Sequence, residues 1–429
     1  MSALLGGGDR AALSDRPGTY RDALKNREFR GLVIAQVTSE WGDHIARVAL
    51  ASLVLRRTDS ALLAVLAFVV SFVPAVFGSA ILGSFADRLP RKVILLGCDL
   101  ARFVVMLLLA ALAVSSTPIW VLLGLLLVAE TFYAPFEVAQ RSVIPDVLTD
   151  PKDYLAGNSL MRMLYQLDQV IGICLAGLVI HAIGERWGLL LNASTFAVSF
   201  VVIALMLRWR PATREASERT NSLLTDLRAG WRLVFDDPAL RALVLLGWGA
   251  SVFLIAPEAV GLAYARADGA SAAIGAALMA SVPAGASIGA FLVGRLGPLR
   301  QVRAIVPLVV VTCLPLLATC FSPPWEVALV LWFASGLGQG FMVPLMATVS
   351  LVSPAKFRGR VIGLAAAGFS ATTALTFLLS GLVADLTSPA VAVTFAAVIG
   401  LALVGAAHRT WPRGAIQRAA SRVYAPDRA

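Results

Sequence analysis

Twelve apolar runs of membrane-crossing length follow one another along this chain of 429 residues, and they restrict its fold more than any other feature. The hydrocarbon core of a bilayer is about 30 Å thick, so a helix crosses it with about 20 apolar residues. Hydrophobic residues make up 58% of the chain, and its mean hydropathy is +0.80. A spanning segment must satisfy its own backbone hydrogen bonds, which a helix does. The sequence therefore predicts an all-α polytopic membrane protein with 12 transmembrane helices. The runs lie roughly at 29–55, 61–84, 92–114, 119–141, 158–181, 187–208, 241–265, 271–294, 303–321, 325–349, 360–384 and 388–408.

A turn of charged residues between the second and third runs sets the expected orientation. It reads GSFADRLPRK, residues 83–92. Loops rich in Lys and Arg resist translocation and stay in the cytosol. With this turn inside, both termini are cytoplasmic, and 29 of the 36 Lys and Arg lie on the cytosolic side, four outside and three within spans. The net charge of +10 then indicates contact with an anionic lipid leaflet and no nucleic-acid partner.

The two halves of the chain are related by an internal repeat. Three landmarks of the first six runs recur 209–211 residues later: Arg30 as Arg241, Gly83 as Gly294 and Pro145 as Pro354. Two pseudo-symmetric six-helix bundles are one way in which transporters are built, with the substrate site between them near mid-membrane. The linker places Leu223, Leu224, Leu227, Trp231 and Phe235 on one helical face, which predicts an amphipathic helix in the cytosolic interface. The predicted divisions are a cytosolic tail (1–28), the first half (29–208), the linker (209–240), the second half (241–408) and a basic cytosolic tail (409–429).

The charged turn also carries a family resemblance. GSFADRLPRK matches the G-x-x-x-D-R-x-x-R-K turn between spans 2 and 3 of the major facilitator superfamily. The chain is similar to the drug and siderophore exporter branch, which includes macrolide and enterobactin exporters. It departs from that branch in span 5, where Gly172 is followed by Ile173 and not by the proline of the antiport-associated Gly-Pro pair. The resemblance implies alternating access by rocking of the two halves. Its supporting pieces are NREFR (26–30), GDHIARVAL (42–50), PFEVAQRSVIPDVL (135–148) and RGRV (358–361).

The resemblance further implies a cytosolic gate at this turn. Asp87 could meet the positive N-terminal end of span 11 near Gly359 and Arg360, with Arg141 of span 4 nearby. That contact would hold the cytosolic side shut and would break when the halves rock. The alternative is that the turn only anchors the topology. The gate residues expected on this basis are Gly83, Asp87, Arg88, Arg91, Lys92 and Arg141.

Polar side chains within the first run share one helical face. They follow at steps of four, three, one and three residues: Gln36, Glu40, Asp43, His44 and Arg47. Asp43 lies about 21 Å from the cytosolic end of the run, near the bilayer midplane. An ionisable group at that depth costs at least about 2.5–3.5 kcal/mol, so it faces a cavity or a partner. This stripe predicts a wet cavity, with side chains of other spans completing its lining.

The fourth and fifth runs add polar side chains at helical spacing. The side chains expected to line the substrate cavity or couple protons are Glu40, Asp43, His44, Arg47, Glu130, Gln166, Gln169 and Glu258. A carboxylate that meets water on each side in turn can carry a proton, and the candidates in order are Asp43, Glu40 and Glu130. Asp43 could equally be structural, and His44 is expected to be a hydrogen-bonding partner. Two local pairs are also expected, one of Glu137 with Arg141 and one of Asp99 with Arg102.

The repeat offset predicts one further contact. Arg47 plus 211 is Glu258, the single acid of span 7, and symmetry-related positions lie at equal depth. We expect these two side chains to attract each other across the outer mouth when the protein opens inward.

The motifs and the charge pattern leave three classes of function open. The first is a secondary transporter that exports amphipathic small molecules in exchange for protons, and the second is an uptake permease on the same scaffold. A membrane receptor or enzyme is the weakest, because no lysine follows a glycine to form a phosphate loop and no HExxH pair occurs. The four cysteines lie in spans without CxxC spacing, so no cofactor or metal is expected. The predicted setting is a bacterial plasma membrane, with the small-molecule substrate, protons and the lipid bilayer as partners of a monomer.

Overall fold

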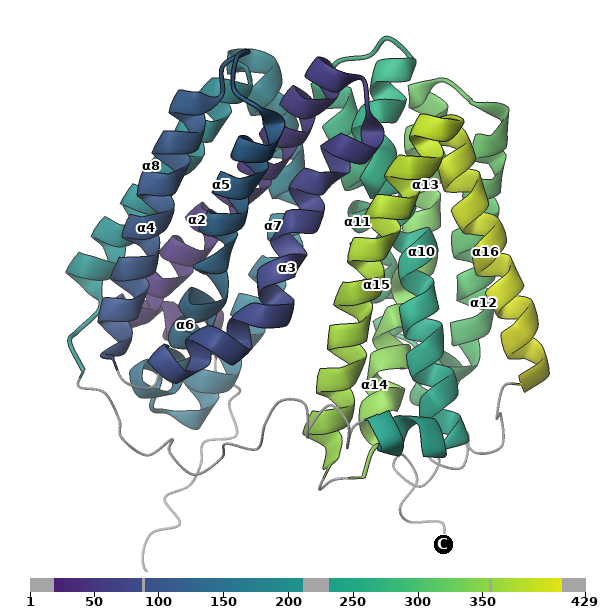
Figure 1. Cartoon of the computed structure of the whole chain (residues 1–429). Helices are drawn as coiled ribbons and strands as arrows, with labels where there is room; N and C mark the ends of the chain where they lie inside the picture. The colour runs from purple at the N-terminus through teal and green to yellow at the C-terminus, as the bar shows by residue number, and fades with distance from the viewer. Residues whose placement is uncertain (1–18, 87–88, 211–230, 355–356, 411–429) are drawn as a thin grey trace, which may run out of the picture.

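The computed structural model describes residues 19–86, 89–210, 231–354 and 357–410. Within these ranges, the side chains of 73, 75–86, 166, 298 and 407–410 are left out of the description. The described chain is helical, and long helices run along one common direction (Figure 1). The prediction of an all-α polytopic protein is confirmed.

The N-terminal half contains six spans after a short first helix. The fourth span is broken at Phe132, so that two helices, α5 and α6, make it up. The elements of this half are α1 (Tyr20–Lys25), α2 (Arg27–Thr58), α3 (Ala61–Ala86), α4 (Arg91–Leu112), α5 (Ile119–Thr131), α6 (Tyr133–Val147), α7 (Pro151–Ile183) and α8 (Glu185–Met206).

The C-terminal half repeats this order of six spans. Its fourth span is broken at the corresponding place by a short 3₁₀ helix, η2 (Gln339–Phe341). The other elements are α10 (Pro238–Ala267), α11 (Ala272–Gly294), α12 (Pro298–Leu317), η1 (Ala318–Phe321), α13 (Trp325–Gly338), α14 (Met342–Val352), α15 (Arg358–Leu386) and α16 (Pro389–Thr410).

The internal repeat extends to the caps that begin the two halves. The Asn26 side chain accepts hydrogen bonds from the backbone N–H groups of residues 28 and 29 at the start of α2. Asp237, 211 residues later, does the same for residues 239 and 240 at the start of α10. A side-chain oxygen at this position satisfies backbone donors that the first turn leaves free. Both halves therefore begin with the same local device.

Ten helical segments of the described chain are long and apolar enough to cross a membrane. The remaining two of the twelve spans are α2 and α3. Helix α2 spans 32 residues but carries Glu40, Asp43 and Arg47 in its middle. These charges lower its hydropathy, and the next subsection shows where each of them points. Twelve transmembrane helices in two six-helix bundles are thus present, as the sequence predicts.

The two halves lean together at one end of the molecule and diverge toward the other (Figure 1). Helix α8 ends and helices α10 and α15 begin at the diverging end, which we call the open end. At the opposite, closed end, α3 packs on α15 and α7 packs on α11. Two glycines allow this close approach: a Cβ on Gly177 would lie 2.3 Å from the Cβ of Ala276, and one on Gly381 would lie 2.8 Å from the Cα of Leu62. Larger side chains would push the halves apart.

Polar contacts also join the halves at the closed end. The Asp385 carboxylate of α15 accepts hydrogen bonds from Ser60 Oγ at 2.5 Å and from the backbone N–H groups of residues 61 and 62 at 2.6 and 3.2 Å. It thereby caps the N-terminus of α3 from the other half, where the helix dipole favours a negative charge. Arg266 of α10 forms an ion pair with Asp59, which ends α2 in a left-handed conformation. Breaking this set of contacts is required for the closed end to open.

The predicted linker helix is described only in part. Leu223, Leu224 and Leu227 lie outside the described residues, and residues 231–236 are helical. Trp231 stacks on Phe235 with ring centroids 4.1 Å apart. At the other end of the linker, Arg210 donates to the Glu28 carboxylate at 2.6 and 3.1 Å, which ties the segment to the start of α2. The domain boundaries given by the sequence stay a prediction.

Candidate functional site

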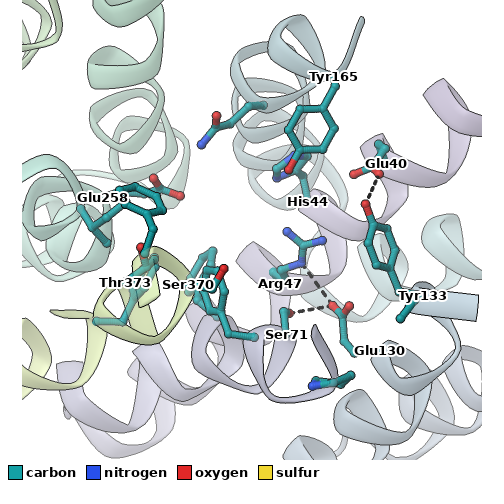
Figure 2. A pocket seen from close by; sticks show the side chains of 18 residues that line it. Glu40, His44, Arg47, Ser71, Glu130, Tyr133, Tyr165, Glu258, Ser370 and Thr373 are labelled. Carbon is teal, nitrogen blue, oxygen red and sulfur yellow. Dashed lines mark hydrogen bonds and ion pairs between the residues drawn. The ribbon is translucent and has the colours of Figure 1, made fainter. Parts of the chain in front are cut away.

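A cavity of about 440 Å³ lies between the halves, within the volume range of small-molecule sites. Helices α2, α3, α5, α6 and α7 form its wall in the first half, and α10 and α15 form its wall in the second. Its lining combines carboxylates, aromatic rings and hydroxyls (Figure 2). The lining residues are Glu40, His44, Arg47, Phe68, Ser71, Phe72, Pro74, Glu130, Tyr133, Ala134, Tyr165, Gln169, Ile255, Glu258, Phe369, Ser370, Thr373 and Phe377.

Three polar residues of α2 face this cavity. Glu40, His44 and Arg47 follow at steps of four and three residues, so they lie on one side of a helix with 3.6 residues per turn. The expectation that they line a cavity agrees with their position. The apolar residues of α2 predict a membrane-spanning helix. Its polar stripe determines which side of this helix faces the other half of the protein.

Glu130 is the centre of a small polar network at the end of α5. Its Oε1 accepts hydrogen bonds from Arg47 Nε at 3.2 Å and from Ser71 Oγ at 2.7 Å. The side chains of Arg47 and Glu130 are 18% and 5% exposed, so the pair is at the cavity wall and largely removed from water. A charge-assisted hydrogen bond at such a site is stronger than one between neutral groups. This network joins α2, α3 and α5 at the cavity.

Glu40 is held by neutral donors. Tyr133 donates its hydroxyl proton to Glu40 Oε1 at 2.9 Å, and the Gln36 amide donates to the same oxygen at 2.9 Å. Tyr133 is the first residue of α6, directly after the break in the fourth span. The break therefore turns Tyr133 toward α2 and connects it to a second acid of the cavity (Figure 2).

The expectation that Asp43 lines the cavity needs correction. Asp43 is absent from the lining and accepts a hydrogen bond from Arg102 of α4 at 2.6 Å, with the two side chains 2% and 1% exposed. The Arg102 guanidinium also lies 4.1 Å from the ring centroid of Phe196. At 100° per residue Asp43 is rotated about 60° from Glu40, enough to turn it into the helix bundle. The alternative of a structural Asp43 fits this arrangement.

One of the two predicted local pairs is confirmed and the other is wrong. Glu137 and Arg141 form an ion pair within α6. Asp99 instead accepts a hydrogen bond from Ser199 Oγ at 2.6 Å, while its neighbour Arg102 turns to Asp43. Residues three apart on a helix can contact each other, but here Arg102 binds Asp43 on α2 and not Asp99 on its own helix.

His44 lies against α7. A Cβ on Gly172 would lie 2.6 Å from His44 Cδ2, so the glycine leaves room for the imidazole ring between the two helices. Gln169, one turn earlier on α7, lines the cavity as expected. The side chain of Gln166 lies outside the described residues.

Arg47 does not pair with Glu258 in this conformation. Both residues line the cavity, on opposite walls, but no ion pair within 4.0 Å joins them in the described chain. Arg47 points to Glu130 of its own half (Figure 2). Arg47 and Glu258 therefore act on each other electrostatically across the cavity, as predicted, but the direct contact of Arg47 is with its own half.

The residues of the charged turn fall into two groups. Asp87 and Arg88 lie outside the described residues, and Gly83 is described only as part of helix α3. Lys92 donates to the backbone oxygens of residues 204 and 207 at 2.7 and 2.6 Å. Arg91 donates to the backbone oxygen of Ser142 at 2.8 Å and forms an ion pair with Asp146. These contacts tie α4 to α6 and α8 within one half, and the predicted gate between Asp87 and span 11 stays a prediction.

Aromatic residues of α3 and α15 were missed by the sequence analysis. Phe68 and Phe377 stack across the two halves with ring centroids 5.4 Å apart, and Phe72 lies 6.0 Å from Phe377. A phenylalanine in an apolar span gives no signal by itself. The spacing of Ser370, Thr373 and Phe377 on one face of span 11 could have indicated this wall, because hydroxyls are unusual on a lipid-facing side.

The comparisons with known proteins agree with this fold and site. The sequence matches the model of the Major Facilitator Superfamily over residues 32–324 and 259–419. The chain therefore belongs to the Major Facilitator Superfamily. Its members are transporters and not enzymes. The confirmed family is the one that the charged turn between α3 and α4 resembles.

Curated relatives are similar over most of the chain. The multidrug efflux pump Tap of Mycolicibacterium fortuitum is 25% identical over 370 residues, covering 82% of this chain and 88% of the pump. The pump of the same name in Mycobacterium tuberculosis is 26% identical over 380 residues, covering 82% and 86%. These names agree with the exporter branch that the sequence motifs resemble.

Solved structures share the fold at low sequence identity. The nucleoside transporter NupG has a TM-score of 0.71 and 13% identity, covering 90% of this chain and 99% of its own. A D-xylose-proton symporter has a TM-score of 0.63 and 15% identity, covering 90% and 97%. At such identities the likeness concerns the architecture alone.

Proposed function

We propose that this protein is a secondary active transporter that exports small amphipathic molecules across a bacterial plasma membrane in exchange for protons. The observation that carries the proposal is the cavity of about 440 Å³ between two repeated halves, with acids and aromatic rings in its lining. Its volume suits a drug-sized molecule, and its rings suit an apolar body. The names of the two efflux pumps similar to this chain support the outward direction.

The open end is the cytosolic one in this proposal. Helices α4 and α10 begin and α8 and α16 end at that end, and loops rich in Lys and Arg, such as the one expected between α3 and α4, remain in the cytosol. The conformation is then inward-facing, with the Asp385 cap and the Arg266–Asp59 pair closing the outer side. Substrate enters from the cytosol or the inner leaflet, and it leaves after the closed end opens.

Proton coupling is assigned to acids of the cavity. Glu40 and Glu130 are the candidates, because both line the cavity that would open to each side of the membrane in turn. Asp43 is removed from this role by its buried contact with Arg102. When the halves rock, the cavity would open to each side in turn, so that one of these acids would take up a proton from the outer side and release it to the cytosol.

Export and uptake are separated by one experiment. Cells that overexpress the chain are loaded with a fluorescent dye or a macrolide, with and without a protonophore. Export predicts lower accumulation than in cells with the empty vector and loss of the difference with protonophore. Higher accumulation than in the control cells would support an uptake permease, and equal accumulation of every compound would contradict transport of this class.

A further inference from the structure

The charged groups on the two walls of the cavity are partnered differently. On the first-half wall, Arg47 neutralises Glu130, and Glu40 accepts two hydrogen bonds from neutral donors. On the second-half wall, Glu258 of α10 is the one acid, and within the described residues it has neither a hydrogen bond nor an ion pair. Arg47 attracts this carboxylate from the opposite wall but forms its ion pair with Glu130. A carboxylate at membrane depth without a direct partner is costly. Glu258 is therefore the carboxylate of this cavity to which a ligand can supply a hydrogen bond or a positive charge.

A second polar group lies beside Glu258 without a partner. Thr373 is 4% exposed, and its Oγ1 has no hydrogen-bond partner in the described chain. It lies next to Glu258 on the wall opposite Arg47 and Glu130 (Figure 2). A buried hydroxyl without a partner has lost its hydrogen bonds to water without replacement, which is unfavourable. The Glu258 carboxylate and the Thr373 hydroxyl, both without a hydrogen bond in the described residues, thus lie on one wall of the cavity.

The surroundings of these oxygens are apolar. Ile255 precedes Glu258 by one turn of α10, and Phe369 and Phe377 of α15 line the same part of the cavity. Aromatic faces attract a cation, and most strongly at desolvated sites. The wall thus offers one negative charge, one oxygen acceptor and apolar surface for the rest of a molecule.

Arg47 limits the charge of the molecule that fits. Its guanidinium faces the cavity from the first-half wall, where it holds Glu130. A second positive charge on a ligand would approach this guanidinium and be repelled. An anionic group would have to displace Glu130 from Arg47 while it remained near Glu258. A ligand with a single positive charge is therefore compatible with the charged groups on both walls.

We propose that Glu258, with Thr373 beside it, is the recognition site for one positive charge on the transported molecule, which makes lipophilic monocations the preferred substrates. This inference rests on the proposed transport function and specifies its substrate class. The positive charge sits at the second-half wall, and the apolar body extends over the rings of α3 and α15.

The test measures binding of tetraphenylphosphonium to the purified full-length protein in lipid nanodiscs. Triphenylphosphine oxide serves as the neutral comparison and tetraphenylborate as the anionic one. We expect the cation to bind at least tenfold more tightly than either, and Glu258→Gln to weaken cation binding at least tenfold while leaving binding of the oxide unchanged. Glu258→Asp keeps the charge and is expected to retain binding within about threefold to fivefold.

A matched control makes the same chemical change outside the cavity. Glu326 lies exposed at the start of α13 in the same half, and Glu326→Gln is expected to bind tetraphenylphosphonium like the unaltered protein. Thr373→Val removes only the hydroxyl, and a smaller loss of twofold to fivefold is expected. Equal affinity of Glu258→Gln and the unaltered protein for the cation would overturn the inference, as would equal binding of cation and oxide by the unaltered protein.

Failure of this inference and failure of the proposed function give different results. Export of dyes by a protein that does not bind the cation would overturn the monocation preference and leave the transport function standing. Glu258-dependent cation binding without any protonophore-sensitive transport would support the recognition site and contradict the proposed function.

Discussion

Two ion pairs start from the same helix one turn apart and reach different surroundings. Asp43 of α2 turns into the helix bundle and meets Arg102 of α4, with both side chains at most 2% exposed. Arg47 turns to the cavity and meets Glu130 of α5, where its side chain is 18% exposed. The first pair is sealed among helices of one half. The second lies at the surface along which the halves move.

This difference teaches how one polar stripe can serve two purposes. A sealed pair cannot exchange its proton with water unless the bundle opens, so its effect is to fix how helices pack. A pair at a cavity wall can be reached by water, protons and ligands. The following tests set one pair against the other, beginning with the largest effect expected.

Breaking the sealed pair should affect folding most. Asp43→Leu leaves the Arg102 guanidinium buried without its carboxylate, and removal of one partner of such a pair costs about 3–5 kcal/mol. We expect poor expression and a much lower unfolding temperature in detergent. Thermal unfolding followed by size-exclusion chromatography measures this. Lys25→Ala, in an exposed pair with Asp22, is the control and should leave the unfolding temperature close to that of the unaltered protein.

Removing both partners provides the stricter version of this test. Asp43→Leu combined with Arg102→Leu replaces the pair by apolar side chains and should recover part of the lost stability. A double variant that is less stable than either single variant would contradict a purely structural role.

Changing the cavity pair should reduce transport and leave the fold in place. Glu130→Gln keeps the size of the side chain but removes the charge that holds Arg47. We expect at least a tenfold loss of protonophore-sensitive transport, with an unfolding temperature close to that of the unaltered protein, because water can reach the freed guanidinium. Transport by everted vesicles with an imposed pH difference is the measurement. A stability loss as large as that of Asp43→Leu would remove the distinction between the pairs.

The closed end offers a test of conformation. Asp385→Asn removes the charge that caps α3 and should shift the equilibrium toward opening by about 1–2 kcal/mol. A cysteine at Ala259, buried between the halves near Phe68 in this conformation, reports the shift. In a background with the four native cysteines replaced, we expect several-fold faster labelling from outside. An unchanged labelling rate would mean that Asp385 does not hold this end shut.

The smallest expected effect comes from a single hydroxyl. Tyr133→Phe removes the hydrogen bond to Glu40 and leaves the one from Gln36 in place. One such bond contributes about 0.5–1.5 kcal/mol, so transport should fall only a few-fold. Initial rates of transport measure it. A loss as large as that of Glu130→Gln would make Glu40 the more important acid.

The sequence by itself determined the helices, their number and the division into two repeated halves. Hydrophobic length and an offset of 209–211 residues are local or periodic features, and a bilayer leaves few other ways to satisfy the backbone. It also indicated that α2 carries a polar stripe facing a cavity, with Glu40, His44 and Arg47 among its members.

The tertiary structure alone decided which polar groups meet. Asp43 lies within the same arc of α2 as Glu40, and only the position of Arg102, 59 residues later on α4, turns it into the bundle. The wall made by Phe68, Phe377 and Thr373 depends on how α3 crosses α15. Helical periodicity gives the direction of a side chain to within tens of degrees, whereas a hydrogen bond depends on tenths of an ångström between helices that the sequence does not place.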